Sequence, residues 1–264
     1  MKPTICLSKA FAILLLTQMS LTVNGSVFDG MYISLGGGLQ QNTTKLSSQT
    51  IAEVDPGGAI VSINLDNKLQ TYDNNILGEI ATGYSKILKD HIFVAADASL
   101  TMHPKLVNKV NQDLLSTANG TPSTILNRAN KLQGSNLDLT LALKMGWAVT
   151  NNTVIYGLIG PQLTSFKSSS KAYYSADFGG GPFSAEGKDS NSKFKVGTAL
   201  GAGLAQHIKD NIVIGLKYTH TIYNNMPETS FTSPIDGGAT GTLNMRNKER
   251  LKTDAVILNV TYYI

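Results

Sequence analysis

Residues 136–149 alternate between apolar side chains and polar or small ones. The apolar face would consist of Leu137, Leu139, Leu141, Leu143, Met145, Trp147 and Val149. A period of two excludes a helical face, whose period is near 3.6. At about 3.3 Å per residue, this run is longer than most strands of soluble proteins and long enough to cross a bilayer at a tilt. It predicts a long strand with one apolar and one polar face.

The same alternation recurs along the chain. It is found in residues 31–40, 76–85, 92–102, 153–164, 194–205, 212–219 and 256–264, although residues 153–164 fit either register. Together with residues 136–149 these segments make eight strands, an even number, as a closed antiparallel transmembrane barrel requires. The expected fold class is therefore all-β, an eight-stranded antiparallel transmembrane β-barrel.

The connections between these segments are alternately short and long. Residues 88–90, 151–152 and 209–211 suit tight turns, because Asn and Asp favour turn conformations. Residues 41–74, 103–134, 167–192 and 225–248 form long connections, which are uncommon in compact soluble domains. A transmembrane barrel has short turns on its periplasmic side and long loops outside. Residues 50–65 read as a hairpin, whereas residues 105–115 fit a short helix or a hairpin closing at Asn119-Gly120.

The first 25 residues form a separate segment. Lys2 and Lys9 precede an apolar run, residues 10–23, which is too short to span a bilayer comfortably. Small residues then offer a cleavage site before Ser26. This arrangement predicts a secretory signal peptide over residues 1–25, followed by the outer-membrane barrel over residues 26–264.

Charge and cysteine content give no support for a disulfide-stabilised or a nucleic-acid-binding protein. The only cysteine, Cys6, lies in the expected signal peptide, so the exported chain has to be stable without disulfides. The chain has 22 Lys and Arg against 18 Asp and Glu, and two of the lysines belong to the same leader. The remaining chain is close to neutral, which gives no reason to expect nucleic acid as a partner.

Six charged residues fall within the expected strands, all on the face opposite the apolar one. They are Glu79, Asp97, Asp138, Lys144, Lys195 and Lys217. A lysine facing lipid at the bilayer midplane costs roughly 2–4 kcal/mol, so the charged face is expected to point inward. There the three acids and three lysines would form a lumen ion-pair network that specifies the closed barrel. The alternative is an ion path through the lumen.

A basic stripe leads into the last strand. Arg246, Lys248, Arg250 and Lys252 alternate along it, with only Glu249 opposing them. Such a stripe is expected either to contact the phosphates of lipopolysaccharide or an acidic glycan, or to be an ordinary solvated strand extension.

Aromatic residues near the strand ends predict a membrane-interface girdle. They are Phe28, Tyr32, Tyr84, Trp147, Tyr156, Tyr218, Tyr262 and Tyr263. The glycine clusters lack the strand–turn–helix context of nucleotide loops. The four histidines have no metal-ligand spacing, and no catalytic triad or carboxylate pair stands out. No cofactor, metal or catalytic residue is therefore expected.

Taken together, these features resemble the small eight-stranded outer-membrane barrels, namely the OmpA transmembrane domain, OmpX and the Opa-type surface proteins. The resemblance covers residues 26–264 and includes the opening strand Tyr32-Ile33-Ser34-Leu35-Gly36-Gly37-Gly38. It implies outer-membrane lipid, lipopolysaccharide and the barrel-insertion machinery as partners. Such families usually end in an aromatic residue, whereas this chain ends in Tyr262-Tyr263-Ile264.

Four functions follow as hypotheses. The leading one is a non-enzymatic surface antigen or adhesin, whose barrel anchors long loops that contact host or environmental molecules. The second is a small porin with a charged lumen. The third is a lipid-modifying enzyme, for which no set of residues is found. The fourth is a secreted soluble β-sandwich, which alternating strands alone would also permit.

Overall fold

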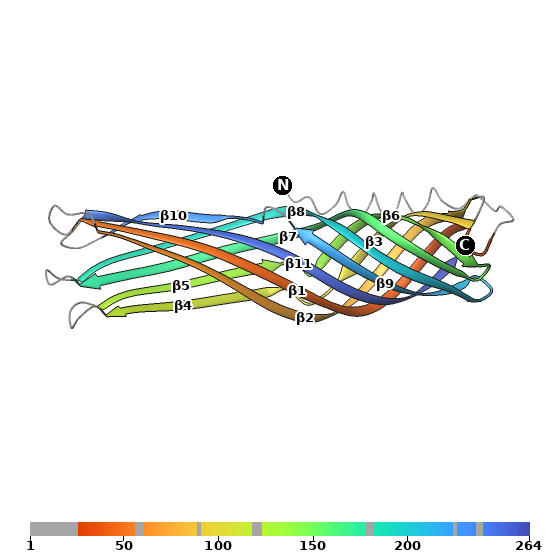
Figure 1. Cartoon of the computed structure of the whole chain (residues 1–264), viewed down its shortest axis with the longest axis horizontal. Coiled ribbons are helices and arrows are strands. Elements are labelled where there is room, and N and C mark those ends of the chain that lie inside the picture. The colour runs from red at the N-terminus through yellow and green to blue at the C-terminus, as the bar shows by residue number, and fades with distance from the viewer. Residues whose placement is uncertain are drawn as a thin grey trace, which may run out of the picture.

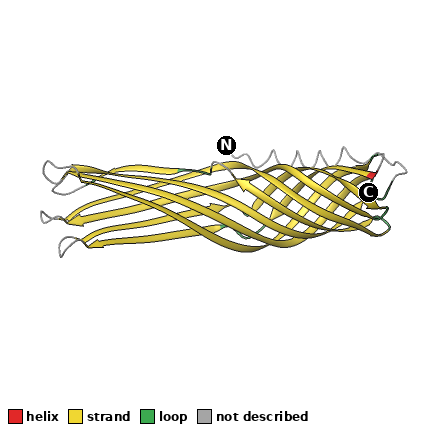
Figure 2. Cartoon of the chain, viewed as in Figure 1, coloured by secondary structure: helices red, strands yellow, loops and turns green. Residues whose placement is uncertain are grey.

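The computed structural model describes residues 26–55, 61–88, 91–117, 123–177, 182–223, 226–235 and 240–264, nearly all in antiparallel strands (Figures 1 and 2). The eleven strands are β1 (Gly30–Asp55), β2 (Val61–Ile87), β3 (Ile92–Met102), β4 (Val107–Thr117), β5 (Ser123–Gly134), β6 (Leu137–Thr150), β7 (Thr153–Asp177), β8 (Pro182–Lys209), β9 (Ile212–Tyr223), β10 (Thr229–Pro234) and β11 (Thr240–Tyr263). The expected signal peptide and the Asn119-Gly120 turn lie outside the described residues.

Eight of these strands close into a ring. β1, β2, β3, β6, β7, β8, β9 and β11 pair in this order, and β11 pairs back to β1. Each contains one of the eight segments expected from the sequence, so the predicted barrel is confirmed. Closure leaves no unpaired edge strand within the ring, so that backbone groups can pair between strands without water. We call the end of the ring with the short connections the turn end and the opposite end the hairpin end.

The ring is apolar outside and largely polar inside. Along β1 and β2 the outward side chains include Leu39 and Ile76, which are 68% and 72% exposed, and Phe194 on β8 is 79% exposed. The predicted inward faces are confirmed in each strand. The register of residues 153–164 is also settled, since Tyr156 and Leu158 point inward while Ile155 and Ile159 point outward.

The four long connections are largely strands, which corrects the prediction of loops, whereas the hairpin predicted for residues 50–65 is confirmed, since Thr50 lies opposite Leu65. β1 and β2 remain paired out to Val54 and Val61, and β7 and β8 out to Asp177 and Pro182. The segment expected to be either a short helix or a hairpin is a hairpin, β4–β5. Sequence patterns miss these strands because Ser, Asn and Lys have low strand propensity, which burial and cross-strand pairing override.

Beyond the ring the strands separate into two sheets. One, the β1 sheet, consists of β10, β11, β1 and β2, and the other, the β7 sheet, consists of β4, β5, β7 and β8. They extend together from the hairpin end (Figure 1). A shared apolar core lies between them, formed by Ala52, Ala172, Tyr174, Ala185, Ile235, Leu243 and Met245, with Phe231 packed against it. We call this pair of packed sheets the two-sheet body.

One seam between the sheets is fastened by hydrogen bonds. Asn191 donates to the Glu228 carbonyl at 3.2 Å, and the Ser230 amide donates to Asp189 at 3.0 Å. The Ser233 hydroxyl donates to the Glu186 carbonyl at 2.8 Å. β8 and β10 are thereby held together, so the two-sheet body is expected to move as a unit.

Two adjacent glycines on β1 give a matched stability test. A Cβ on inward Gly38 would lie 2.0 Å from the Val256 carbonyl oxygen, whereas one on outward Gly37 would meet nothing closer than 3.8 Å. Gly38→Ala is therefore expected to lower the free energy of unfolding by roughly 3 kcal/mol, because the backbone has to shift. Gly37→Ala should be neutral within about 0.5 kcal/mol. Urea titration in detergent micelles measures both, and equal effects would contradict the packing described.

Candidate functional site

The interior is stacked in layers, and the inward face of β7 follows their order. From the turn end outward it reads Val154, Tyr156, Leu158, Gly160, Gln162, Thr164, Phe166, Ser168, Ser170, Ala172 and Tyr174. An aromatic layer is followed by a charged layer, an apolar layer, a polar layer and finally the core of the two-sheet body. Each layer contains residues from several strands that lie far apart in the sequence.

The aromatic layer closes the turn end. Phe28, Tyr32, Phe93, Tyr156 and Tyr263 are buried together, and Phe28 meets Phe93 and Tyr263 edge-to-face at 6.5 and 6.2 Å. This corrects the expected girdle, because Phe28, Tyr32, Tyr156 and Tyr263 point into the barrel. Tyr84, Trp147, Tyr218 and Tyr262 are exposed on the outer surface, as a girdle requires. The alternation separates part of the two groups, since Tyr32 falls on the inward face of residues 31–40 and Tyr263 falls opposite outward Tyr262, whereas the ambiguous register of residues 153–164 left Tyr156 unassigned.

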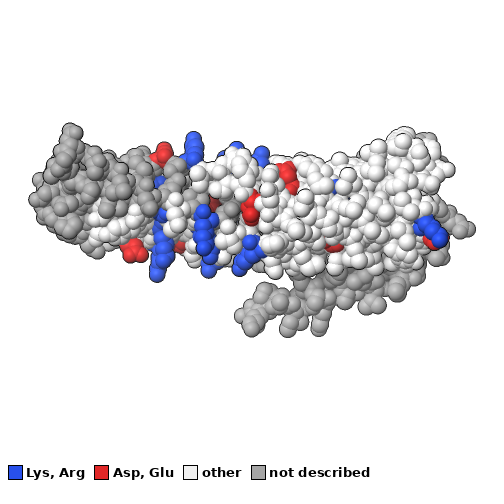
Figure 3. Space-filling model, turned by 90° about the horizontal axis from the view of Figure 1, so that it is seen from below, with Lys and Arg blue, Asp and Glu red and all other residues white. Residues whose placement is uncertain are grey.

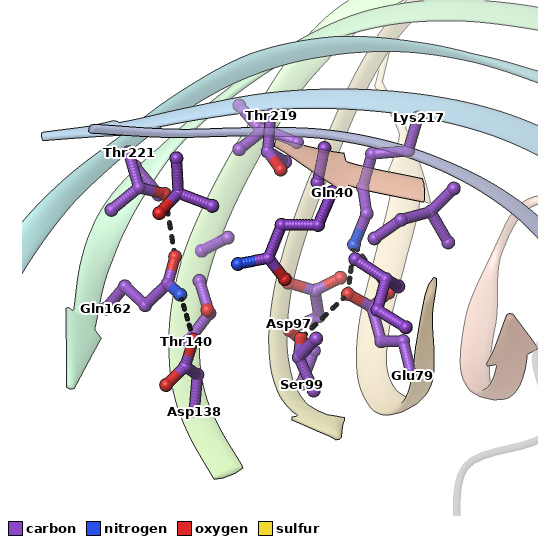
Figure 4. A pocket seen from close by; sticks show the side chains of 18 of the residues that line it. Gln40, Glu79, Asp97, Ser99, Asp138, Thr140, Gln162, Lys217, Thr219 and Thr221 are labelled. Atoms are coloured by element: carbon purple, nitrogen blue, oxygen red, sulfur yellow. Dashed lines mark hydrogen bonds and ion pairs between the residues drawn. The ribbon is translucent and has the colours of Figure 1, made fainter. Parts of the chain in front are cut away.

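Two ion pairs form the centre of the charged layer. Lys217 Nζ donates to Glu79 Oε2 at 2.7 Å, and both side chains are buried (Figure 4). Lys144 pairs with Asp97, whose carboxylate also accepts a hydrogen bond from the Tyr32 hydroxyl at 3.2 Å. The Lys144 ammonium lies 5.5 and 5.3 Å from the ring centres of Tyr32 and Tyr156, which joins the charged and aromatic layers.

The third acid has a partner that sequence reasoning missed. Asp138 Oδ2 lies 3.2 Å from His103 Nε2 and accepts a hydrogen bond from Gln162 Nε2 at 2.8 Å. Gln162 in turn accepts one from the Thr221 hydroxyl at 2.7 Å (Figure 4). His103 follows the last residue of β3, in a segment assigned to a loop, but it continues the inward positions Ser99 and Thr101, so extending the alternation by one residue would have found it.

Lys195, the sixth charged residue, differs from the other five. It lies on the inward face of β8, paired in register with Thr164, and is half-buried. Among the described residues it makes no ion pair, whereas Lys144 and Lys217 each make one. The structure thus brings four of the six residues into two ion pairs, sets Asp138 against His103 in the same layer, and places Lys195 nearer the hairpin end.

The charged layer has little free space. It encloses a cavity of about 30 Å³, lined in part by Gln40, Ser99 and Thr140 (Figure 4), which has room for roughly one or two water molecules. An apolar layer of Leu106, Leu132, Phe166, Tyr223, Met226 and Leu251 covers it on the hairpin side. Phe166 and Tyr223 meet edge-to-face at 5.2 Å. The charged layer is therefore enclosed between two apolar layers.

A polar layer follows the apolar layer toward the hairpin end, at the base of the two-sheet body. The buried Arg128 donates to the Ser48 hydroxyl at 3.2 Å, and Asn247 donates to Asn130 and Ser170 at 3.1 and 2.6 Å. Glu249 is 6% exposed and accepts one hydrogen bond, from the Ser168 hydroxyl at 3.3 Å. Burial disfavours the carboxylate and raises the pKa of Glu249 to about 7.

The predicted basic stripe lies on the outer face of the β1 sheet. Arg246, Lys248, Arg250 and Lys252 are all exposed, and Arg250 lies directly opposite Lys45 of β1. Glu228 partly neutralises the stripe, since its carboxylate is 3.1 Å from Arg246 and 3.8 Å from Lys248. On the face shown in Figure 3, Lys and Arg side chains gather over the base of the two-sheet body, whereas the ring surface is mostly uncharged.

The described part of the chain contains neither a metal-ligand cluster nor a membrane-spanning helix. No group of three or more His, Cys, Asp or Glu residues there could hold a metal ion. Within the same residues, no helix has the length and apolar character needed to cross a bilayer.

The chain is similar in sequence to one protein family and in fold to several solved structures. A family model described as the outer membrane protein beta-barrel domain matches residues 10–263. No curated protein sequence matches the chain. Similar solved structures include OprG from Pseudomonas aeruginosa, at 13% identity over 92% of this chain and 100% of that one, with a TM-score of 0.42. Ail of Yersinia pestis is 12% identical over 85% of this chain and 99% of that one, with a TM-score of 0.33. The outer membrane protease OmpT from Escherichia coli is 9% identical over 93% of this chain and 99% of that one, with a TM-score of 0.28.

Proposed function

The chain belongs to the outer membrane protein beta-barrel domain family, and on that premise we propose that it is a non-enzymatic surface protein whose barrel anchors the two-sheet body outside the cell. In outer-membrane barrels the short turns face the periplasm and the long connections face outward. The turn end is then periplasmic, and the two-sheet body presents its faces to host or environmental molecules.

The observation that carries this proposal is the contrast between a filled ring and an elaborate exterior. β1 has 26 residues and β8 has 28, which is about 85–95 Å of extended chain, against a hydrocarbon core of about 30 Å. The excess length forms the paired sheets with their own apolar core, which a membrane anchor alone does not need. Binding residues commonly lie on connections held by a rigid scaffold.

The test removes the two-sheet body and leaves the ring intact. The variant closes four hairpins with Asn-Gly turns, joining Thr43 to Tyr72, His103 to Asn136, Lys167 to Ser192 and Tyr223 to Leu251, since each pair lies in register or is hydrogen-bonded across its two strands. Cells that display it should lose adhesion to host cells or matrix, while heat-modifiable gel migration shows that the ring still folds. Adhesion equal to that of the full chain would contradict the proposal.

We further propose that the basic stripe contacts the phosphates of lipopolysaccharide where the β1 sheet leaves the membrane. Cationic side chains there face the headgroup region of the outer leaflet. Changing Lys248 and Arg250 to glutamine should weaken lipopolysaccharide retention during purification, with the same change at Lys86 and Lys209 of the turn end as control. Equal retention in both variants would contradict this contact.

A charged lumen is a feature of porins, but the aromatic and apolar layers of this ring argue against conduction. Apolar layers lie on both sides of a cavity of about 30 Å³. We expect no channels above background in planar bilayers, because ions would have to cross two layers of packed aromatic and apolar side chains. Phe166→Ala, which thins the upper layer, should also remain closed, because the aromatic layer persists. Steady conductance that changes in Lys144→Gln would overturn this expectation.

A further inference from the structure

A second group of cationic side chains lies on the outer face of the β7 sheet, opposite the face that packs on the core. It consists of Lys109 on β4, Lys131 on β5, Lys171 on β7 and Lys188 on β8. We call these four residues the paired-lysine site. No strand contributes more than one of them, so nothing in the local sequence pointed to this cluster.

The lysines stand in directly opposed pairs. Lys109 is in register with Lys131, and Lys171 is in register with Lys188. Side chains so placed have Cβ atoms about 5 Å apart, and like charges there destabilise a sheet. Because Ala129 is opposite Lys171, and Ser169 opposite Lys131, the two pairs are offset by one row, about 7 Å along the strands.

Small side chains separate the lysines and leave room between them. Asn111, Ala129, Ser169 and Ser190 line, together with the four lysines, a surface groove of about 460 Å³. The floor therefore offers hydroxyl and amide groups, and the rim offers ammonium groups. Four strands at about 4.8 Å spacing spread these charges over about 15 Å, which is too wide for a single phosphate or sulfate to reach them all.

Neutralising acids are few at this site. Among the described side chains, Asp189 lines the groove, but its carboxylate accepts the Ser230 amide at 3.0 Å. Glu186 is exposed one row farther out, opposite Tyr173. None of the four lysines makes an ion pair within the described residues, whereas Arg246 and Lys248 of the basic stripe share Glu228. The paired-lysine site thus keeps more uncompensated charge than the stripe.

We infer that the paired-lysine site binds a saccharide that carries several phosphate or sulfate groups. Lysine is a point-charge partner for such anions, and an anion between opposed lysines would relieve the repulsion that they otherwise impose. Two sources share this chemistry, the phosphorylated core of lipopolysaccharide in the same membrane and a sulfated saccharide from outside the cell. The inference rests on the proposed function only in requiring that the β7 sheet face outward.

The test uses the full chain in lipid nanodiscs free of lipopolysaccharide. A Lys131→Gln/Lys171→Gln variant is titrated with sulfated dextran and with phosphorylated lipopolysaccharide, and neutral dextran measures background. We expect roughly tenfold weaker binding and a shallower salt dependence for at least one polyanion. The polyanion whose binding falls identifies the source. Lys86→Gln/Lys209→Gln, which removes the same charge at the turn end, should bind like the parent chain.

A readout of stability distinguishes a binding role from a structural one. Without ligand, the Lys131→Gln/Lys171→Gln variant should unfold at the same or higher urea concentration than the parent, since repulsion is removed. Unchanged binding of both polyanions, or equal weakening in the turn-end variant, would overturn the inference. Neither outcome would affect the proposed surface role, which the hairpin-shortened variant tests separately.

Discussion

Replacing Lys217 with methionine is expected to lower the free energy of unfolding by about 3–5 kcal/mol, because Glu79 would keep a buried charge without its partner. Lys217 and Glu79 are 7% and 5% exposed and come from strands on different sides of the ring. Their attraction links β2 and β9 across the lumen, since the two strands are not neighbours in the ring. Urea titration of the full chain in detergent micelles measures the loss.

Two controls separate the ion pair from ordinary packing. Lys195→Met removes an inward lysine of β8 that has no ion pair among the described residues, and should cost less than about 1 kcal/mol. A Glu79→Leu/Lys217→Met double variant should recover most of the stability, since apolar replacements of buried pairs are often tolerated. If Lys217→Met and Lys195→Met cost the same, the structural role assigned to the pair is wrong.

Acidification is expected to stabilise the two-sheet body through Glu249. Its pKa is raised from 4.5 to about 7 by burial, so the folded state binds a proton more tightly than the unfolded state does. Stability should therefore rise as the pH falls from about 7 to about 4.5, where the unfolded carboxyl also becomes protonated. The full shift corresponds to about 3 kcal/mol. Protection factors of amides in β7 and β11, measured by hydrogen exchange between pH 5 and 8, follow this change.

The matching variant is Glu249→Gln, which has no proton to lose. It should abolish the pH dependence and be more stable than the parent at pH 8. Glu228→Gln changes an exposed glutamate of the same region and should keep the dependence of the parent chain. A parent and a Glu249→Gln variant with identical pH profiles would rule out Glu249 as the titrating group.

The ring could be predicted closely because bilayer and lumen impose opposite demands on alternate residues. Every second residue from Leu137 to Val149 faces outward, and the acids at 79, 97 and 138 face inward. The same period of two therefore identified the strands and the face that each residue occupies. The paired Lys144 and Lys217 followed from the same rule, since a buried charge needs a partner. Which lysine meets which acid depends on strand order around the ring, which periodicity does not contain.

The two-sheet body was harder to predict, for a physical reason. Outside the membrane no lipid surrounds the strands, so neither face has to be apolar. On β7 the buried face carries Ser168 and Ser170 and the exposed face carries Lys171, and this pattern has no hydrophobic period of two. The contact of His103 with Asp138 and the paired-lysine site both depend on which distant strands lie side by side. The aromatic layer was misplaced because aromatic residues were grouped by their position near strand ends; the alternation places Tyr32 and Tyr263 inward, whereas Phe28 precedes the first predicted strand and Tyr156 lies in the segment of ambiguous register.

Labelling single cysteines on intact cells tests whether the filled ring carries the two-sheet body outside the cell. In a Cys6→Ser background, Glu53→Cys near the tip of the β1–β2 hairpin and Asn151→Cys in a short turn each provide the only thiol, and both positions are exposed. A membrane-impermeant maleimide should label the cysteine at position 53 on intact cells and the one at 151 only after lysis. Labelling at 151, with none at 53, would contradict the account.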